Sequence, residues 1–362
     1  MEKRKLTASI WGAGFIAQTH AKVLHEMGVD IKLIYNRTQD KAESLAAICG
    51  AEIATTDESL LLETPVDVVH LCTPANLHYE QTVKLIEAGF NIFCEKPLTL
   101  NREEAISLEK LAEERGIITG LGFNVRYHQA IGRAKEIIQD PSFGKINLVH
   151  GAYLQEFHAL PAFLDWRYDT RTGGKMRAVT EIGSHWMDLV QFLTGNKILG
   201  LSATFSSFSP ERTLVDGMMY PKEVEGEKIK LESEDAAIIT FKFEDGFIGN
   251  CVLSEASQGR TNMLSVEVTG ERKNLWWQSE EVNNLYLAEK GKGFTTFRAA
   301  FGGGFEDTYR LMFKDFYRDI AKGKKRKDST YPSFSDGARN VVLCQAVYES
   351  AMNDSKWVYI ND

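Results

Sequence analysis

The sequence is poor in the features that mark disulfide-bonded or zinc-binding proteins. Its 362 residues contain five cysteines, an odd number, scattered mostly through apolar runs. They are Cys49, Cys72, Cys94, Cys251 and Cys344. None forms a C-x-x-C pair or a zinc-like cluster, which favours reduced, buried thiols. We therefore expect a protein of the reducing cytoplasm.

Long apolar runs and an excess of positive charge are also missing. No apolar stretch is long enough for the core of a signal peptide or for a membrane span. Lys and Arg total 42 against 50 Asp and Glu, and the net charge of −8 argues against a nucleic acid or an anionic membrane as partner. The basic run at 322–327 indicates a solvated loop. A small-molecule partner remains, and it can be phosphorylated, because local amides outweigh the global field.

Histidines with the spacing of a metal site are lacking as well, so we expect no metal. Six of the eight histidines belong to no motif: His20, His25, His70, His128, His150 and His158.

Strand-like and helix-like patterns alternate over the first third of the chain. Predicted strands cover 6–11, 31–35, 66–74, 91–97 and 117–124, and predicted helices cover 16–27, a segment ending at 50, 76–88 and 101–116. Asn76 is the expected N-cap of the third helix. This rhythm predicts right-handed βαβ units and a doubly wound parallel sheet.

The pattern changes after residue 124. Helices are predicted at 131–138 and 180–193, and long alternating runs at 146–154, 201–208, 235–243, 247–256 and 263–270 indicate a largely antiparallel sheet. The charged segment 209–234 is expected to be a surface insertion. Such a sheet would leave one face without helices, so we expect a homodimer or homotetramer built sheet to sheet.

The first chemical motif is G-A-G-F-I-A, between the first predicted strand and helix. Gly12 permits a tight turn, and Gly14 has no side chain, so a pyrophosphate can approach the backbone. Ala17 allows close packing of helix on strand. The phosphate would then bind free amides at the positive end of the helix, at Phe15 and Ile16. The motif predicts dinucleotide binding.

The end of the second strand decides which dinucleotide binds. Proteins that bind NAD usually place Asp or Glu there to hold the ribose 2′-hydroxyl, but this chain has Asn36-Arg37-Thr38. Arg37 with two neutral neighbours could receive a 2′-phosphate. We therefore favour NADP(H), while Asn36 leaves NAD(H) possible.

Two further loops end strands at the carboxyl edge of the predicted sheet, where doubly wound proteins bind ligands. The first contains Thr73, Pro74, Asn76 and His78, and His78 is expected to position the loop near the cofactor. The second is Glu95-Lys96-Pro97, with Lys96 aimed at the nicotinamide end and Glu95 alongside. A lysine there can hydrogen-bond a substrate hydroxyl and favour its alkoxide as hydride leaves.

These motifs resemble the Gfo/Idh/MocA family of sugar and cyclitol oxidoreductases. G-x-G-x-x-A is followed by T-P-x-x-x-H and E-K-P, and then by Gly-Gly at 173–174 and E-I-G-S-H-W-M-D at 181–188. The similarity covers essentially the whole chain. It implies that the lysine of E-K-P and an acid-x-x-x-His pair form the catalytic group, which gives Lys96, Glu181 and His185 here. The family usually has Asp where this chain has Glu181.

The resemblance also implies that a Trp-Arg pair contacts the cofactor, here Trp166 and Arg167. A Trp that anchors the loop with Arg at the surface is the alternative. Asn124 and Arg126 lie where the chain leaves the first predicted domain, and both substrate contact and a hinge role are open for them.

We therefore expect an α/β protein with an NAD(P)-binding Rossmann domain at 1–124 and a substrate-binding, oligomerising α+β domain at 125–362. It would transfer a hydride between the nicotinamide and a carbinol or keto carbon of a sugar, sugar derivative or cyclitol. His185 would be the general acid/base, Lys96 would hold the reacting oxygen, and Glu181 would tune the pair. Two alternatives remain: a catalytically inert regulatory protein that binds the cofactor, and a dihydrodiol-dehydrogenase-like enzyme acting on an aromatic substrate.

Overall fold

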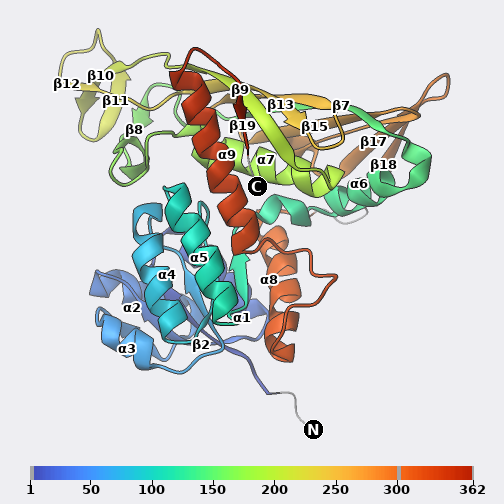
Figure 1. The fold of residues 1–362 in the computed structure, drawn as a ribbon. Helices are drawn as coiled ribbons and strands as arrows, with labels where there is room; N and C mark the ends of the chain where they lie inside the picture. Colours follow the sequence, from blue (N-terminus) through green and yellow to red (C-terminus); the bar gives the residue numbers. More distant parts are fainter. Residues whose placement is uncertain (1–3, 300–302, 361–362) are drawn as a thin grey trace. The chain divides into compact units, whose positions relative to one another are not determined.

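The computed structural model describes residues 4–299 and 303–360, which fall into two compact units. Of the described residues, the first unit contains 4–127 and 304–341, and the second contains 128–299, 303 and 342–360. Within the described residues the strands form three sheets (Figure 1). None of the described helices combines the length and hydropathy needed to span a bilayer.

The first unit is built on a six-stranded parallel sheet with the strand order β3-β2-β1-β4-β5-β6. Its strands are β1 (Thr7–Trp11), β2 (Asp30–Tyr35), β3 (Ile53–Thr55), β4 (Val68–Leu71), β5 (Asn91–Cys94) and β6 (Thr119–Leu121). The two halves of the sheet run outward from β1 and β4. In such a sheet the ligand crevice lies at the carboxyl ends of the strands, at this reversal of order.

Helices cover both faces of this sheet, so most residues of its central strands are buried (Figure 1). One face packs against α1 (Phe15–Glu26), α2 (Gln39–Cys49) and α8 (Phe305–Lys322). The other packs against α3 (Glu58–Glu63), α4 (His78–Glu87), α5 (Arg102–Glu114) and the start of α9 (Phe334–Met352). The predicted doubly wound parallel fold is confirmed.

Three features of the first unit differ from the expectations. The short strand β3 and helix α3 were not predicted. Asn76 does not cap a helix, because a 3₁₀ turn (Ala75–Leu77) precedes α4 and puts Leu77 at the N-cap. The segment 304–341 packs in this unit, although it lies inside the range 125–362 that was expected to form the second domain.

The second unit is built on a nine-stranded mixed sheet with the order β18-β17-β16-β15-β7-β14-β13-β9-β19. Its strands are β7 (Ile146–Leu154), β9 (Ile198–Ser206), β13 (Ala236–Phe243), β14 (Ile248–Ser254), β15 (Met263–Gly270), β16 (Lys273–Gln278), β17 (Asn284–Glu289), β18 (Gly293–Arg298) and β19 (Val358–Tyr359). All neighbouring pairs are antiparallel except β7 and β14. Helices α6 (Gln129–Gln139) and α7 (Ser184–Thr194) pack on it (Figure 1).

The charged segment after β9 is more ordered than expected. It forms β10 (Glu211–Val215), β11 (Met218–Pro221) and β12 (Glu227–Lys230), which join β8 (Ala162–Phe163) in a four-stranded antiparallel sheet. The strands are short and Asp216-Gly217 forms the tight turn between β10 and β11, with both residues at positive φ. This small sheet has its own apolar cluster, centred on Ala162, Tyr168 and Met219.

Candidate active site

The carboxyl edge of the parallel sheet brings together the sequence-predicted residues of the first unit. Gly12 follows β1, Asn36 follows β2, Thr73 follows β4 and Lys96 follows β5. Because all these strands are parallel and adjacent, the loops emerge at the same edge. The structure thus places the expected cofactor loops side by side within one unit.

The two glycines of the first loop have different reasons to be glycine. Gly12 has a φ of +113°, and a Cβ there would lie 2.7 Å from the carbonyl oxygen of Cys72. Packing against the end of β4 therefore requires glycine at 12. A Cβ on Gly14 would meet no protein atom within 4 Å. The fold itself therefore does not require glycine at position 14. Close approach of a ligand to the backbone accounts for the glycine there.

Helix α1 begins beside this loop without a capping side chain. Its N-cap is Gly14, and no side chain accepts a hydrogen bond from the first turn. The Phe15 side chain is 78% exposed, whereas Ala17 is fully buried against the sheet. Uncapped amides at a helix N-terminus form a binding site for a phosphate, so the residues present fit a dinucleotide pyrophosphate.

The loop directly after β2, where the ribose of a cofactor would bind, has no carboxylate at residues 36–38. Nδ2 of Asn36 donates to the carbonyl oxygen of Thr38 at 3.1 Å. Arg37 and Thr38 are both exposed. The amide group of Asn36 also has an oxygen, which can act as a hydrogen-bond acceptor.

His78 fastens two of the edge loops to each other. Its ring nitrogens lie 2.8 Å from the carbonyl oxygens of Thr73 and Pro97. The ring is buried, and burial lowers its pKa, although these two carbonyls act in the opposite direction. Thr73 donates to Oε1 of Gln81 at 2.5 Å, while Pro74 and Asn76 are exposed. His78 thus connects the loops after β4 and β5.

The E-K-P loop presents two charged residues in different surroundings. Lys96 is partly exposed. Glu95 is only 6% exposed, and its carboxylate contacts His20, the Tyr309 hydroxyl and the backbone N–H of Lys96. The Glu95 side chain is therefore turned into the unit, and not outward beside Lys96.

In the second unit the predicted catalytic helix begins with a π turn. The π segment spans Val179–Gly183 and continues as α7, where the sequence predicted one regular helix. Such turns are common at functional sites, where they change the direction of a side chain. Oε2 of Glu181 on this turn accepts a hydrogen bond from Nε of Arg167 at 3.0 Å. Glu181 is thus held as one half of an ion pair.

His185 lies at the start of α7 and is partly exposed. The ring of Tyr153 on β7 lies 6.4 Å away, centroid to centroid. The Tyr153 hydroxyl donates to Oδ1 of Asn262 at 2.9 Å, and burial raises the pKa of Tyr153 to about 12. The phenol therefore keeps its proton at neutral pH. The sequence analysis missed Tyr153, whose only signal was the alternation of the β7 run.

Two pairs of residues from the sequence analysis have mainly structural contacts. Trp166 is 37% exposed, and the Arg167 guanidinium lies 4.6 Å from its ring centroid. Asn124 donates to Oγ1 of Thr308 at 2.7 Å, and Arg126 donates to Asp336 at 2.6 Å. Asn124 and Arg126 thus tie the end of the first segment of this unit to α8 and α9, and both substrate contact and a hinge role stay predictions.

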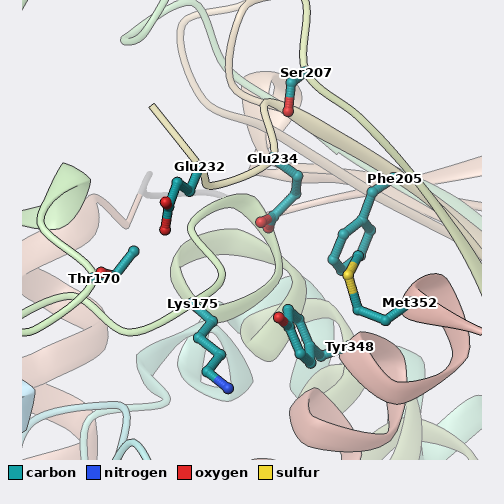
Figure 2. Close-up of a pocket in the computed structure, with 8 residues that line it drawn as sticks. All are labelled: Thr170, Lys175, Phe205, Ser207, Glu232, Glu234, Tyr348 and Met352. Atoms are coloured by element: carbon teal, nitrogen blue, oxygen red, sulfur yellow. The ribbon is translucent and has the colours of Figure 1, made fainter. Parts of the chain in front are cut away.

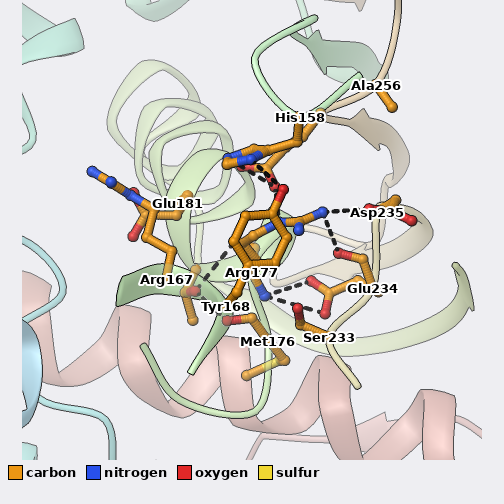
Figure 3. A network of polar contacts seen from close by, with 12 residues as sticks. His158, Arg167, Tyr168, Met176, Arg177, Glu181, Ser233, Glu234, Asp235 and Ala256 are labelled. Carbon is orange, nitrogen blue, oxygen red and sulfur yellow. Dashed lines mark hydrogen bonds and ion pairs between the residues drawn. The ribbon is translucent and has the colours of Figure 1, made fainter. Parts of the chain in front are cut away.

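A buried ionic network anchors the segment before the π turn (Figure 3). Arg177 is 1% exposed and donates to Glu255 at 2.6 Å and to Asp235 at 2.5 Å, and its guanidinium lies over the Tyr168 ring. Glu234 accepts the backbone N–H groups of Arg177 and Val179. The network therefore holds the backbone immediately before the π turn and at its first residue. Sequence reasoning missed it because its acids lie more than 50 residues after Arg177.

Burial perturbs the titration of this network. It raises the pKa of Glu234 to about 7 and that of Glu255 to about 7, with Arg177 acting in the opposite direction. Burial also lowers the pKa of His158, which contacts the Tyr168 hydroxyl, to about 3. His158 is therefore neutral and structural.

A cavity of about 320 Å³ opens beside Glu234 in the second unit (Figure 2). Its walls come from the loop before the π turn, the end of β9, the segment before β13 and the last turns of α9. They are Thr170, Lys175, Phe205, Ser207, Glu232, Glu234, Tyr348 and Met352. None of the sequence-predicted site residues lines it.

Comparison with known proteins agrees with the geometry. Residues 6–123 match a family model described as "Oxidoreductase family, NAD-binding Rossmann fold", and residues 131–275 match the "GFO/IDH/MocA C-terminal domain". The chain belongs to the Gfo/Idh/MocA family. The chain is also similar to a levoglucosan dehydrogenase of Pseudarthrobacter phenanthrenivorans, with 27% identity over 98% of both chains. A scyllo-inositol 2-dehydrogenase (NAD(+)) of Bacillus subtilis is 26% identical over 89% of this chain and 88% of its own length.

A solved structure of levoglucosan dehydrogenase in complex with NADH and L-sorbose has the same fold. It superposes with a TM-score of 0.89 and 27% identity over 99% of both chains. The family recognised from the sequence motifs is confirmed, as are both parts of the predicted fold. This Gfo/Idh/MocA member is therefore an oxidoreductase that acts on CH–OH groups and binds a nicotinamide dinucleotide through its Rossmann domain.

Proposed function

We propose that the protein transfers a hydride between a nicotinamide and a carbinol carbon of a sugar, sugar derivative or cyclitol. The observation that supports this most strongly is the set of loops at the carboxyl edge of the first sheet, with Lys96 among them. The relatives named for levoglucosan and scyllo-inositol support the substrate class. A bound nicotinamide would supply or accept the hydride at its C4.

The proposed roles divide the chemistry among three side chains. Lys96 donates a hydrogen bond to the reacting oxygen and stabilises its alkoxide character. His185 takes the hydroxyl proton in oxidation and returns it in reduction. Glu181 orients His185 and stabilises its charged form. Arg167 in turn holds the Glu181 carboxylate at 3.0 Å, which limits the freedom gained by having Glu where the family usually has Asp.

For the cofactor we propose NAD(H), although Arg37 favoured NADP(H) in the sequence. Asn36 commits an N–H of its amide to Thr38 and leaves its oxygen as an acceptor. A ribose hydroxyl can donate to that oxygen, whereas a 2′-phosphate has only acceptor oxygens at neutral pH. The NADH complex of a relative and the NAD-binding description of the family model support the same choice.

We also propose a homodimer or homotetramer formed through the nine-stranded sheet. Ile238, Ile248 and Val252 on β13 and β14 are 59%, 52% and 40% exposed on one face, and Ile238 pairs directly with Val252. An apolar patch of this kind is typical of an interface. Ile238→Glu should lower the molecular mass that analytical ultracentrifugation measures for the oligomer, whereas Ile48→Glu on α2 should not. An unchanged mass for Ile238→Glu would contradict the interface.

The test of function begins with fluorescence titrations of NADH and NADPH. The preferred cofactor is then used with a panel that contains levoglucosan, myo-inositol, scyllo-inositol and keto-sugars, and NADH absorbance is followed. Turnover of one or more of these compounds is expected. Tight cofactor binding without turnover across the panel would instead favour a regulatory protein.

A further inference from the structure

A row of buried polar side chains crosses the core of the first unit and ends beside Lys96. Nε2 of His20 lies 3.0 Å from Oε1 of Glu95, and Nδ1 of His20 lies 3.0 Å from Nδ1 of His70. Nε2 of His70 lies 2.9 Å from the Tyr317 hydroxyl. Both histidines have no exposed surface. The row therefore runs Tyr317–His70–His20–Glu95 within a single unit.

Aromatic rings enclose the two histidines. His70 stacks on Phe93 with ring centroids 5.3 Å apart and an interplanar angle of 19°. His20 packs edge-on against Phe313 at 4.9 Å. Polar groups in such surroundings cannot exchange their partners for bulk water, so they must satisfy one another.

The protonation of one end of the row fixes the direction of its hydrogen bonds. Burial raises the pKa of Tyr317 well above its usual value, so the phenol keeps its proton. Burial lowers the pKa of His70 well below the usual value, so its ring is neutral. Within residues 4–299 and 303–360, Tyr317 contacts no other acceptor for its O–H. Tyr317 therefore donates to Nε2 of His70.

The remaining protons follow from this first bond. A neutral His70 that accepts at Nε2 must have its proton on Nδ1, and it donates to Nδ1 of His20. The Cys72 thiol, 3.3 Å away, also faces this nitrogen of His20, and burial keeps the pKa of Cys72 well above its usual value. His20 then has its proton on Nε2 and donates to Glu95. With both histidines neutral, each of their ring nitrogens has one hydrogen-bond partner in this arrangement.

The Glu95 carboxylate accepts three hydrogen bonds at the end of the row. Oε1 accepts from His20 and from the Tyr309 hydroxyl, each at 3.0 Å, and Oε2 accepts from the backbone N–H of Lys96 at 3.2 Å. Gly122 makes room for it, because a Cβ there would lie 2.5 Å from both carboxylate oxygens. The carboxylate is thus seated between the core and the backbone of the E-K-P loop.

Helix α8 supplies one end of the row and some of the side chains that surround it. Tyr309, Phe313 and Tyr317 are four residues apart and therefore share one face of the helix. The return of residues 304–341 to the first unit is what completes the row.

We propose that Glu95, held by His20, His70 and Tyr317, is a positioning residue for Lys96. It fixes the backbone from which the long lysine side chain extends toward the reacting oxygen. This inference rests on the proposed function, in which Lys96 contacts that oxygen. A displacement of about 1 Å at such a group costs roughly a hundredfold in rate, so a rigid support has a measurable effect.

The kinetic test uses a variant of nearly equal volume. In Glu95→Gln, an amide NH₂ takes the place of Oε2 and faces the N–H of Lys96, so two donors oppose each other. We expect kcat on the substrate found in the panel to fall about tenfold to a hundredfold, with KM and NADH affinity little changed. Tyr317→Phe, which removes one hydroxyl at the far end of the row, should lower kcat less than Glu95→Gln does. If Glu95→Gln does not fold, Tyr317→Phe is the variant that tests the positioning role.

The matched control separates positioning from stability. Leu24→Ala removes a fully buried side chain from the same core without touching a polar group of the row. It should lower the melting temperature at least as much as Glu95→Gln and leave kcat unchanged. Equal kcat losses in the two variants at equal loss of stability would contradict a positioning role.

A second measurement does not depend on turnover. Nitrogen-15 NMR of histidine-labelled protein should show the Nδ1–H tautomer for His70 and the Nε2–H tautomer for His20, assigned with His70→Gln and His20→Gln. The opposite tautomers would overturn the inference, because Glu95 would then have to donate to His20.

The outcomes separate this inference from the function on which it rests. An inactive Lys96→Met with a fully active Glu95→Gln and a fully active Tyr317→Phe removes the positioning role alone. A fully active Lys96→Met removes the proposed function and this inference with it. Inactive Lys96→Met, slowed Glu95→Gln and the predicted tautomers together support both.

Discussion

At the scale of single residues, the proposed chemistry depends on Lys96 and His185. Lys96→Met and His185→Ala should each lower kcat by at least about a hundredfold, because general acid–base catalysis contributes roughly that much or more. Neither side chain is needed for the dinucleotide phosphates, so NADH affinity should stay close to that of the native chain. Steady-state kinetics and fluorescence titration measure the two effects.

The controls for this pair are Lys41→Met, which alters an exposed lysine on α2, and His150→Ala, which alters a histidine on β7. Both should retain full turnover. Native turnover in Lys96→Met and in His185→Ala would eliminate the mechanism.

The ribose pocket gives a second prediction at this scale. Arg37 is exposed, so Arg37→Ala should preserve the fold and leave NADH binding nearly unchanged. NADPH, whose 2′-phosphate would use the guanidinium, should bind about tenfold more weakly, which corresponds to roughly 1.4 kcal/mol. Titration of both cofactors checks this. Equal weakening of the two would mean that Arg37 does not contact the 2′ position.

At the scale of elements, the two glycines in the turn between β1 and α1 have different roles, one in cofactor binding and one in folding. Gly14→Ala adds a Cβ that meets no protein atom, so its melting temperature should match that of the native chain while NADH affinity falls at least about tenfold. Gly12→Ala forces a Cβ into the Cys72 carbonyl at positive φ, and it should destabilise the first unit by roughly 1–3 kcal/mol. Normal NADH affinity in Gly14→Ala would contradict the assignment of this turn.

The network before the π turn predicts a dependence of stability on pH. The folded-state pKa of Glu234 is raised by burial to about 7 from 4.5, so the folded chain binds this proton more tightly than the unfolded chain. Its contribution to stability is therefore largest below pH 4.5 and is lost as the pH rises to about 7. Glu255 acts in the same sense.

Thermal melts between these two pH values should show a falling melting temperature for the native chain and a smaller slope for Glu234→Gln. The exposed neighbour Glu232→Gln should keep the native slope. A Glu234→Gln slope as steep as that of the native chain would mean that Glu234 does not titrate in this range.

The elements also show where sequence reasoning succeeds. The β1–α1 turn, the E-K-P loop and the helix after residue 179 were found because each has a local motif in a recognisable strand or helix. The π turn was missed, since it depends on Glu234 and on Arg177 contacts made more than 50 residues apart. Tyr153 was missed for the same reason, because only the sheet brings it to His185.

At the scale of the whole molecule, the alternation of strands and helices predicted both architectures but not the path of the chain. No local pattern signals that 304–341 returns to the first unit, because the Tyr309 and Tyr317 hydroxyls have hydrogen-bond partners more than 200 positions earlier. The strands in 209–234 were missed because their pattern is charged and their apolar cluster is small. Both features depend on packing between residues far apart in the sequence, which local patterns do not reveal.

We propose that in this Gfo/Idh/MocA member Lys96 contacts the reacting oxygen during hydride transfer. The most direct test is a single-turnover experiment in which enzyme saturated with NAD⁺ is mixed with the panel substrate and NADH absorbance is recorded. The account predicts rapid NADH formation by the native chain and Lys41→Met, and none on that timescale by Lys96→Met. NADH formation by Lys96→Met at the native rate would contradict it.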